Sequence, residues 1–311
     1  MNFEHVPVLL DEIVEIMDPQ PGEVFVDCTL GGGGHSKEFV KRLKPGGVLI
    51  GIDQDSNALQ AAEKNLEEYK ENVIFVHSNY ERLGDVLKIH CPQGVNGILF
   101  DLGVSSHQLD EGERGFSYMQ DAPLDMRMNQ EGSLTAHDII NNFSPTQLTE
   151  IIQDYGEEKW AKRIVEFIVA RRKETPIETT GQLVDIIKAA IPAGARKEGP
   201  HPAKRTFQAI RIAVNRELEV LENTLDTAVK WLKKGGRIGV ISFHSLEDRI
   251  VKEKFKHIAL DCICPPELPI CQCVKQSEIK ILTRKPVTAS QAELKKNPRS
   301  RSAKFRAALK L

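Results

Sequence analysis

Four consecutive glycines and an aspartate form the pattern in this chain that is most suggestive of chemistry. Gly31 to Gly34 directly follow an apolar run, and glycines in that position let a ligand approach the backbone closely. Asp53 comes 20 residues after Gly33, at the end of a second apolar run. A carboxylate at that separation typically accepts hydrogen bonds from the ribose hydroxyls of an adenosine-containing cofactor. The glycines and the acid together predict such a cofactor site, whereas the glycines alone would be weak evidence.

The glycine spacing favours a cofactor that carries no pyrophosphate. The dinucleotide fingerprint has glycine at its first, third and sixth positions, and the pyrophosphate lies on the helix N-terminus. Counted from Gly31, the sixth position is Ser36, and His35 would crowd a phosphate. S-adenosyl-L-methionine has an amino-acid tail and no phosphate, so the turn predicts this methyl donor. A nicotinamide-dependent oxidoreductase, which would share the glycines and Asp53, is the alternative.

A second aspartate, Asp101, ends another apolar run that begins at Gly97. Ligands of open α/β sheets bind beyond the carboxyl ends of the strands, so we expect Asp101 beside the methyl group of the donor. Asp101 is the candidate catalytic residue, because a carboxylate there could accept a hydrogen bond from the group that is methylated. The alternative is that Asp101 only caps the turn that follows it.

Apolar runs and amphipathic segments alternate in the N-terminal third of the chain, and the runs are predicted as buried parallel strands. The following segment has helical periodicity, and a strand at 237–243 comes after a predicted long helix at 206–232. We therefore expect an α/β fold, a Rossmann-like class I methyltransferase sheet with an inserted helical domain. The first four predicted strands are residues 23–29, 48–53, 73–76 and 97–101. The predicted parts are 1–108 for cofactor binding, 109–203 for the helical insertion, and 204–311 for the return to the sheet and a basic C-terminal segment.

The composition is that of an ordinary globular protein, with 41% hydrophobic and 28% charged residues among 311. No apolar run approaches the roughly 20 residues of a membrane span, and the N-terminus lacks a secretory signal, so we expect a cytoplasmic protein without a membrane partner. The net charge is −2, but residues 295–311 contain seven basic side chains and no acidic one, and a second basic cluster spans 196–216. Each segment alone would indicate a solvated surface, whereas the two together favour an anionic substrate.

Four of the six cysteines form two CxC pairs, Cys262 with Cys264 and Cys271 with Cys273. Four thiolates could bind zinc, but structural zinc sites usually have CxxC spacing, and cytosolic thiols also stay reduced without a metal. The sequence therefore assigns no metal ligand and leaves metal binding by these cysteines open.

Several long motifs occur in a fixed order over nearly the whole chain, at residues 5–12, 33–36, 101–110, 114–117, 123–128, 205–211, 242–249 and 297–301. In these motifs the chain resembles the MraW/RsmH family, bacterial methyltransferases that act on the cytosine N4 of small-subunit (16S) ribosomal RNA. The resemblance implies S-adenosyl-L-methionine as the cofactor, RNA recognition by the helical insertion, and small-subunit ribosomal RNA as the partner. It leaves open whether naked RNA or the assembled subunit is the substrate, and which oligomer forms.

The family pattern also implies the cofactor contacts residue by residue. His107 stands where relatives often have proline, so we expect the local turn to differ while the site persists. Gly33, Gly34 and His35 are implied to contact the backbone of the methyl donor, and Asp53 to bind its ribose. Tyr80 is implied to lie against the adenine, and Asp101 and Gln108 to complete the pocket.

Methylation of cytosine N4 poses a specific chemical problem, because the amine lone pair is delocalised into the ring. An acceptor on N4–H would favour the more nucleophilic, pyramidal amine, and Asp101 or its neighbouring carbonyls are the candidates. Many amino-methyltransferases have Pro-Pro-aromatic after this acid, whereas Leu102, Gly103 and Val104 follow Asp101. An aromatic that stacks on the base would then come from elsewhere, with Phe116, Tyr118, Phe243 and His244 as candidates that could equally be core residues. A non-catalytic RNA-binding protein with a relic cofactor pocket is the remaining alternative.

Overall fold

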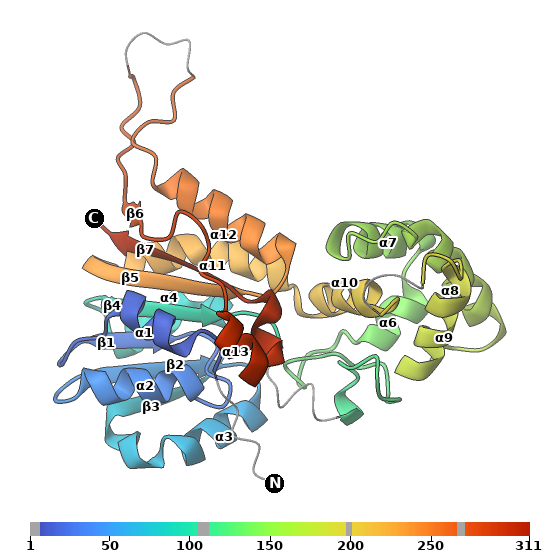
Figure 1. Ribbon diagram of the computed structural model, residues 1–311, viewed down its shortest axis with the longest axis horizontal. Helices are drawn as coiled ribbons and strands as arrows, with labels where there is room; N and C mark the ends of the chain where they lie inside the picture. The colour runs from blue at the N-terminus through green and yellow to red at the C-terminus, as the bar shows by residue number, and fades with distance from the viewer. Residues whose placement is uncertain (1–6, 105–111, 197–200, 266–270) are drawn as a thin grey trace. The chain divides into compact units, whose positions relative to one another are not determined.

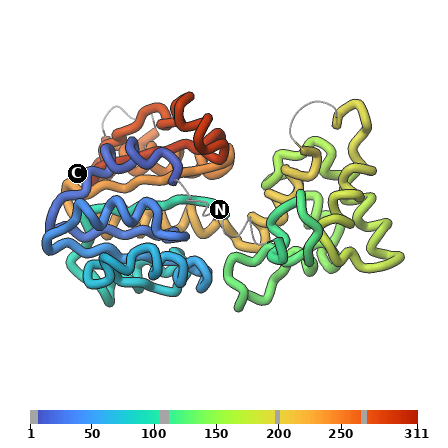
Figure 2. The backbone as a smooth tube through the Cα atoms, turned by 60° about the horizontal axis from the view of Figure 1, so that its bottom comes forward, coloured from blue at the N-terminus to red at the C-terminus, as the bar shows by residue number. Residues whose placement is uncertain are grey.

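The computed structural model describes residues 7–104, 112–196, 201–265 and 271–311, which fall into two compact units (Figure 1). The first unit is Met1–Gly103 with Leu218–Leu311, and the second is Val104–Glu217. In Figure 2 the early part of the first unit, in blue, and its late part, in orange and red, form one body. The second unit is therefore an insertion in the chain of the first. In the described ranges we find no helix with the length and apolarity needed to cross a bilayer.

The described part of the first unit contains the strands β1 (Val24–Asp27), β2 (Val48–Asp53), β3 (Val73–His77), β4 (Val95–Asp101), β5 (Leu232–Ser242), β6 (Ile279–Ile281) and β7 (Lys304–Lys310). They form one sheet of order β3-β2-β1-β4-β5-β7-β6, in which β1 to β5 are parallel and β7 is antiparallel to both its neighbours. The arrangement confirms the predicted Rossmann-like class I methyltransferase sheet.

Helices cover both faces of this sheet, which explains why its central strands are apolar along most of their length. One face packs on α1 (Leu10–Met17), α2 (Gly34–Leu43) and α3 (Ser56–Asn65). The other packs on α4 (Leu83–His90), α11 (Glu217–Trp231) and α12 (Ser245–Ile258). Shorter elements at the sheet edges are η1 (Glu67–Asn72), η2 (Tyr80–Arg82), α13 (Gln291–Lys296) and η5 (Pro298–Ser302).

The basic C-terminal segment contributes a strand that the sequence did not predict, because β7 occupies an inner position in the sheet. Lys304 and Arg306 of β7 form ion pairs with Asp248 of α12, and Lys310 pairs with Glu278. Arg306 is only 8% exposed. The partner carboxylates lie 32 to 58 positions away in the sequence, so the basic residues concealed the strand.

The described part of the second unit is helical and has its own apolar core. Its helices begin at sequence signals: Thr135, Ser144 and Thr179 each form a capping box. The elements are η3 (Gly112–Arg114), α6 (Ala136–Asn142), α7 (Pro145–Glu150), the π-helical turn η4 (Ile151–Tyr155), α8 (Ala161–Glu174), α9 (Thr180–Ala190) and α10 (Lys204–Asn215).

The long helix expected at 206–232 is instead two helices, α10 and α11. Between them Arg216 adopts a left-handed conformation with a φ of 51°. Arg211 forms a bidentate ion pair with Glu217 across the break, with N–O distances of 2.9 and 2.8 Å. Apolar periodicity continues through the break, so the sequence pattern did not reveal it. Helix α10 packs on η4 and belongs to the second unit. The chain therefore returns to the first unit at Leu218, later than the predicted residue 204.

Candidate active site

Three aspartates lie at the carboxyl edge of the sheet. Asp27, Asp53 and Asp101 are the last residues of β1, β2 and β4, which are parallel neighbours with β1 in the middle. The carboxyl ends of parallel strands form the edge where open α/β sheets bind ligands. The structure therefore brings the two predicted acids, Asp53 and Asp101, to one edge, with Asp27 between them.

The glycine turn joins β1 to α2 along this edge. Gly33 has a φ of 76°, in the left-handed region that favours glycine. Gly34 is the first residue of α2, and a Cβ there would lie 2.5 Å from Cγ of Pro7. Packing against Pro7 thus accounts for glycine at position 34, and direct contact of Gly33 and Gly34 with a cofactor stays a prediction.

Asp53 is held by backbone donors on both carboxylate oxygens. Oδ2 accepts a hydrogen bond from the N–H of Gly31 at 2.8 Å, and Oδ1 accepts one from the N–H of Asp55 at 2.9 Å. Burial raises the pKa of Asp53 to about 6, although these two donors act in the opposite direction. Each oxygen retains lone-pair capacity, so Asp53 is able to accept ribose hydroxyls while it stays bonded to the glycine turn.

Asp101 has a buried carboxylate oxygen, Oδ1, for which the described residues provide no hydrogen-bond partner. The backbone N–H of Asp101 donates to Oγ1 of Thr29 at 2.6 Å, which fixes the end of β4 against the glycine turn. The side chain as a whole is 29% exposed, so its other atoms reach solvent. Burial, reinforced by the charge of Glu247, raises the pKa of Asp101 to about 7. A buried acceptor without a partner costs free energy, and a ligand N–H would satisfy it.

His35 lies beside Asp101 as a neutral ring. Its Nε2 is 2.9 Å from the carbonyl oxygen of Val8, which accepts only, so Nε2 carries the proton. Nδ1 lies 3.6 Å from Oδ2 of Asp101, too far for a hydrogen bond. Because burial lowers the pKa of His35, the ring is not a cationic counter-ion for Asp101.

The structure adds two acidic residues that the sequence analysis did not assign, Asp27 and Glu247. Asp27 is buried, and its Oδ2 accepts a hydrogen bond from Oγ of Ser36 at 2.6 Å, which joins β1 to the first turn of α2. Burial raises the pKa of Asp27. Glu247 accepts from the N–H of Phe243 at 2.8 Å and caps α12. Ser36 and Glu247 belong to the long motifs, but a motif does not tell which of its members face a site.

Tyr80 follows β3 at the same edge of the sheet. Its ring packs edge-on against Phe100 of β4, with centroids 5.5 Å apart and an interplanar angle of 84°. A half-buried ring at this place suits the wall of an adenine pocket, and that role stays a prediction. Gln108, the last predicted cofactor residue, lies outside the described residues, as does His107.

The four aromatic candidates for base stacking divide between the two units. Phe243 and His244 directly follow β5, the strand next to β4, so they are close to the edge that holds Asp101. Phe116 lies in the core of the second unit, and Tyr118 stacks on His201 with centroids 4.7 Å apart. Core packing therefore accounts for Phe116, and a ring contact within the same unit accounts for Tyr118.

The residues at this edge fit a phosphate-free adenosine cofactor with a cationic end. Asp53 offers acceptors for ribose, Tyr80 offers an aromatic wall, and the unpaired Oδ1 of Asp101 offers an acceptor for an N–H donor. These groups suit S-adenosyl-L-methionine, an adenosine cofactor without phosphate.

The sequence and the structure also resemble those of known proteins. A family model described as the MraW methylase family matches residues 2–311. Proteins named Ribosomal RNA small subunit methyltransferase H from Clostridioides difficile and Symbiobacterium thermophilum are 58% and 56% identical over 311 residues, covering all of this chain and 100% and 98% of the relatives. Among solved structures, an rRNA methylase from Streptococcus thermophilus is 10% identical with a TM-score of 0.43, covering 97% of this chain and 93% of that one.

Proposed function

Because the chain belongs to the MraW methylase family, we propose that it transfers the methyl group of S-adenosyl-L-methionine to the exocyclic N4 amine of a cytidine in small-subunit ribosomal RNA. The names of its relatives supply the class of RNA. The choice of an amine as methyl acceptor is supported above all by one observation, the buried and unpaired Oδ1 of Asp101 at the carboxyl end of β4.

The bound sulfonium cofactor supplies an already activated methyl group, so the task of the chain is to align the nucleophile and to handle its proton. Asp53 and the glycine turn hold the donor at the ends of β1 and β2. Oδ1 of Asp101 accepts a hydrogen bond from N4–H, which localises the nitrogen lone pair toward the methyl group. Donor and amine are thereby held on adjacent strand ends of one rigid sheet.

Asp101 also suits the proton transfer that completes the reaction. N4 becomes cationic when it gains a methyl group, and it must then lose a proton. A carboxylate with a pKa of about 7 is close to the optimum for a base at neutral pH. Since the Asp101 side chain is 29% exposed, the proton has a route from the carboxyl group to water.

This role predicts a pH dependence of the single-turnover methylation rate. Protonated Asp101 cannot accept the N4 proton, so the rate should fall as the pH drops below the pKa and level off above it. The midpoint should lie at or below about pH 7, because the sulfonium charge of the bound donor favours the carboxylate. Rates between about pH 5.5 and 8, at saturating donor and RNA, test this limb. A flat profile in that range would exclude Asp101 as the base.

The RNA backbone is proposed to bind an exposed basic patch, which we define as Lys295, Lys296, Arg299 and Arg301 of α13 and η5. The basic residues of β7 are excluded from this patch because they pair with Asp248 and Glu278. In the second basic cluster, Arg211 is occupied by Glu217, and Arg205 donates to the carbonyl of Glu157. All four patch residues are exposed at neighbouring positions, whereas the Arg211 side chain is only 16% exposed, so the C-terminal patch is the better candidate for phosphate contacts.

Replacing all four patch residues with glutamine should weaken RNA binding and flatten its dependence on salt. Each lost phosphate contact removes about 0.7 from the slope of log K against log salt for a single strand, so four contacts remove about 3 at most. The measurement is RNA affinity at several salt concentrations.

A matched control replaces Lys41, Lys70, Lys88 and Lys230, which are exposed near the ends of elements that lead into strands and so lie at the opposite edge of the sheet. It removes the same charge and should keep the parent slope. Equal slopes for the patch variant and the parent would show that the patch is merely solvated.

The proposed function is tested by transfer of an isotope-labelled methyl group to ribosomal RNA, supplied both as naked transcript and as assembled small subunits. Transfer to either substrate supports the proposal and identifies the form that is recognised. RNA binding without transfer to either form would favour the alternative of a non-catalytic RNA-binding protein.

A further inference from the structure

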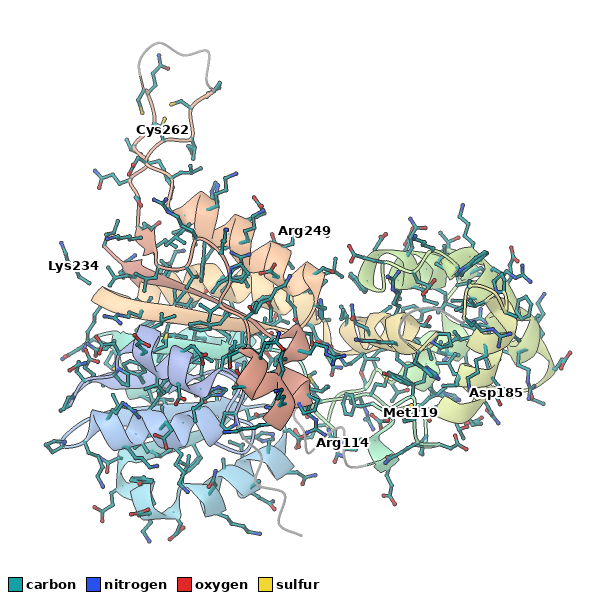
Figure 3. The ribbon with its side chains drawn as sticks, in the orientation of Figure 1. Arg114, Met119, Asp185, Lys234, Arg249 and Cys262 are labelled. Atoms are coloured by element: carbon teal, nitrogen blue, oxygen red, sulfur yellow. The ribbon has the colours of Figure 1, made fainter. Side chains whose placement is uncertain are left out.

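A segment that links α12 to β6 extends away from the sheet and carries four cysteines (Figure 3, where Cys262 is labelled). Cys262 and Cys264 lie on its outgoing arm, and Cys271 and Cys273 lie on the returning arm. All four are free thiols, and their sulfurs lie within 4.8 Å of one another. The methyl-transfer site uses none of them, so the cluster needs an explanation of its own.

The three sulfur–sulfur distances among Cys262, Cys271 and Cys273 are close to the edge length of a sulfur tetrahedron around one metal ion, and Sγ of Cys264 lies within 4.8 Å of the other three. Sγ of Cys262 is 3.4 Å from Sγ of Cys271 and 3.7 Å from that of Cys273, and the latter two sulfurs are 3.6 Å apart. A zinc ion with Zn–S bonds of about 2.3 Å places its four sulfurs about 3.8 Å apart. Disulfides would need sulfur pairs at about 2.05 Å.

Backbone N–H groups are also arranged around the sulfurs. The N–H of Cys264 points to Sγ of Cys262 at 3.4 Å, and that of Ile263 points to Sγ of Cys273 at 3.5 Å. The N–H of Gln272 points to Sγ of Cys264 at 3.3 Å. Donors that surround thiolates offset the negative charge of a four-sulfur site and fix the ligands in orientation. The turn around each CxC pair thus resembles a ligand turn built for metal.

Neither apolar burial nor secondary structure orders the described part of this segment. In the described residues 259–265 and 271–278 no side chain is buried and no helix or strand is present. Ile263 and Val274 are even 55% and 99% exposed. Ordering such a segment costs conformational entropy that apolar burial does not offset here, and metal coordination commonly supplies the missing free energy.

We propose that Cys262, Cys264, Cys271 and Cys273 bind one zinc ion that orders this segment. Soft thiolates select zinc, copper(I) or iron, and the compact sulfur tetrahedron suits a single ion. Four protein ligands close the coordination sphere, so the site is structural and leaves no position for a substrate. Structural zinc sites usually have CxxC spacing, but here two CxC pairs approach each other from opposite arms and together supply four thiolates.

The full-length chain, purified without added metal or chelator, tests the proposal by its metal content. We expect elemental mass spectrometry to find about one zinc ion per chain. Cobalt substitution should give the thiolate-to-metal charge-transfer and intense visible bands of tetrahedral coordination. A wild-type chain without zinc that gives no such bands on cobalt addition would overturn the proposal. One iron ion per chain, or two disulfides that persist in the chain under reducing conditions, would overturn it as well.

A double variant, Cys271→Ser with Cys273→Ser, should lose the zinc and the cobalt bands. It should also become susceptible to proteolysis within 259–278, while the sheet keeps its melting temperature because the cluster lies outside the core. Cys91→Ser is the matched control, since Cys91 donates to the carbonyl of Gly94 and serine preserves that bond. Retention of zinc by the double variant would exclude these cysteines as the ligands.

Discussion

Replacing Asp101 with asparagine should lower the single-turnover methylation rate by about 10²-fold or more, the effect of one positioned acid–base group. Asparagine retains the shape and an acceptor oxygen at the end of β4, but it loses the charge and the ability to take the N4 proton. The backbone N–H bond to Thr29 should persist, so the strand end should stay in place. The affinity for S-adenosyl-L-methionine should therefore change much less than the rate.

Calorimetry of donor binding and single-turnover kinetics at saturating donor separate the two roles of Asp101. A parallel loss of donor affinity with intact chemistry would make Asp101 a cofactor ligand only. Unaltered rate and affinity would remove it from the site. Asp85→Asn, at an exposed aspartate in α4, is the control for the substitution itself and should leave both quantities unchanged. In the Asp101 variant the low-pH fall in rate should also disappear.

Replacing Asp53 with alanine should weaken S-adenosyl-L-methionine binding by at least about tenfold while the fold persists. Hydrogen bonds to a charged acceptor contribute about 1.5–3 kcal/mol each, and a carboxylate that holds both ribose hydroxyls makes two. The structure adds a second contribution, because Asp53 also accepts from the N–H of Gly31 and thereby positions the glycine turn.

A neighbouring variant distinguishes ribose recognition from local loosening. Asp55 caps α3 by accepting from the N–H of Asn57, and it donates its own N–H to Asp53. Asp55→Ala disturbs the turn between β2 and α3, next to Asp53, but leaves the Asp53 carboxylate in place. If Asp55→Ala weakened donor binding as strongly as Asp53→Ala, the loss would come from the loop rather than from ribose. Unchanged affinity of Asp53→Ala would exclude Asp53 from the site.

The sequence was sufficient for the parts of this protein that depend on local pattern. Apolar runs that end in an acid predicted the strands β2 and β4. They therefore also predicted the edge of the sheet that carries Asp53 and Asp101. Parallel strands place their carboxyl ends together, so topology converted two distant sequence positions into neighbours on one edge. The glycines predicted the turn between β1 and α2, although packing on Pro7 is the physical reason for Gly34.

Features that depend on partners far away in the sequence were not predictable. Strand β7 was concealed because Arg306 looks like a solvated basic residue until Asp248 of α12 is placed beside it. Besides burial, the charge of Glu247 raises the pKa of Asp101. Glu247 lies in α12, far from Asp101 in the sequence, and no local pattern reveals that the two are close. The cluster of four cysteines likewise forms only when the two arms of its segment lie side by side.

The central claim is tested most directly by identifying the methylated nucleoside. Ribosomal RNA that has reacted with the enzyme and a donor carrying an isotope-labelled methyl group is digested to nucleosides, which are then separated beside authentic standards and weighed by mass spectrometry. We predict labelled N4-methylcytidine with the wild-type chain, and a product reduced by about 10²-fold with Asp101→Asn at equal reaction times. Label on C5 of cytosine, on a ribose hydroxyl or on another base would contradict the account.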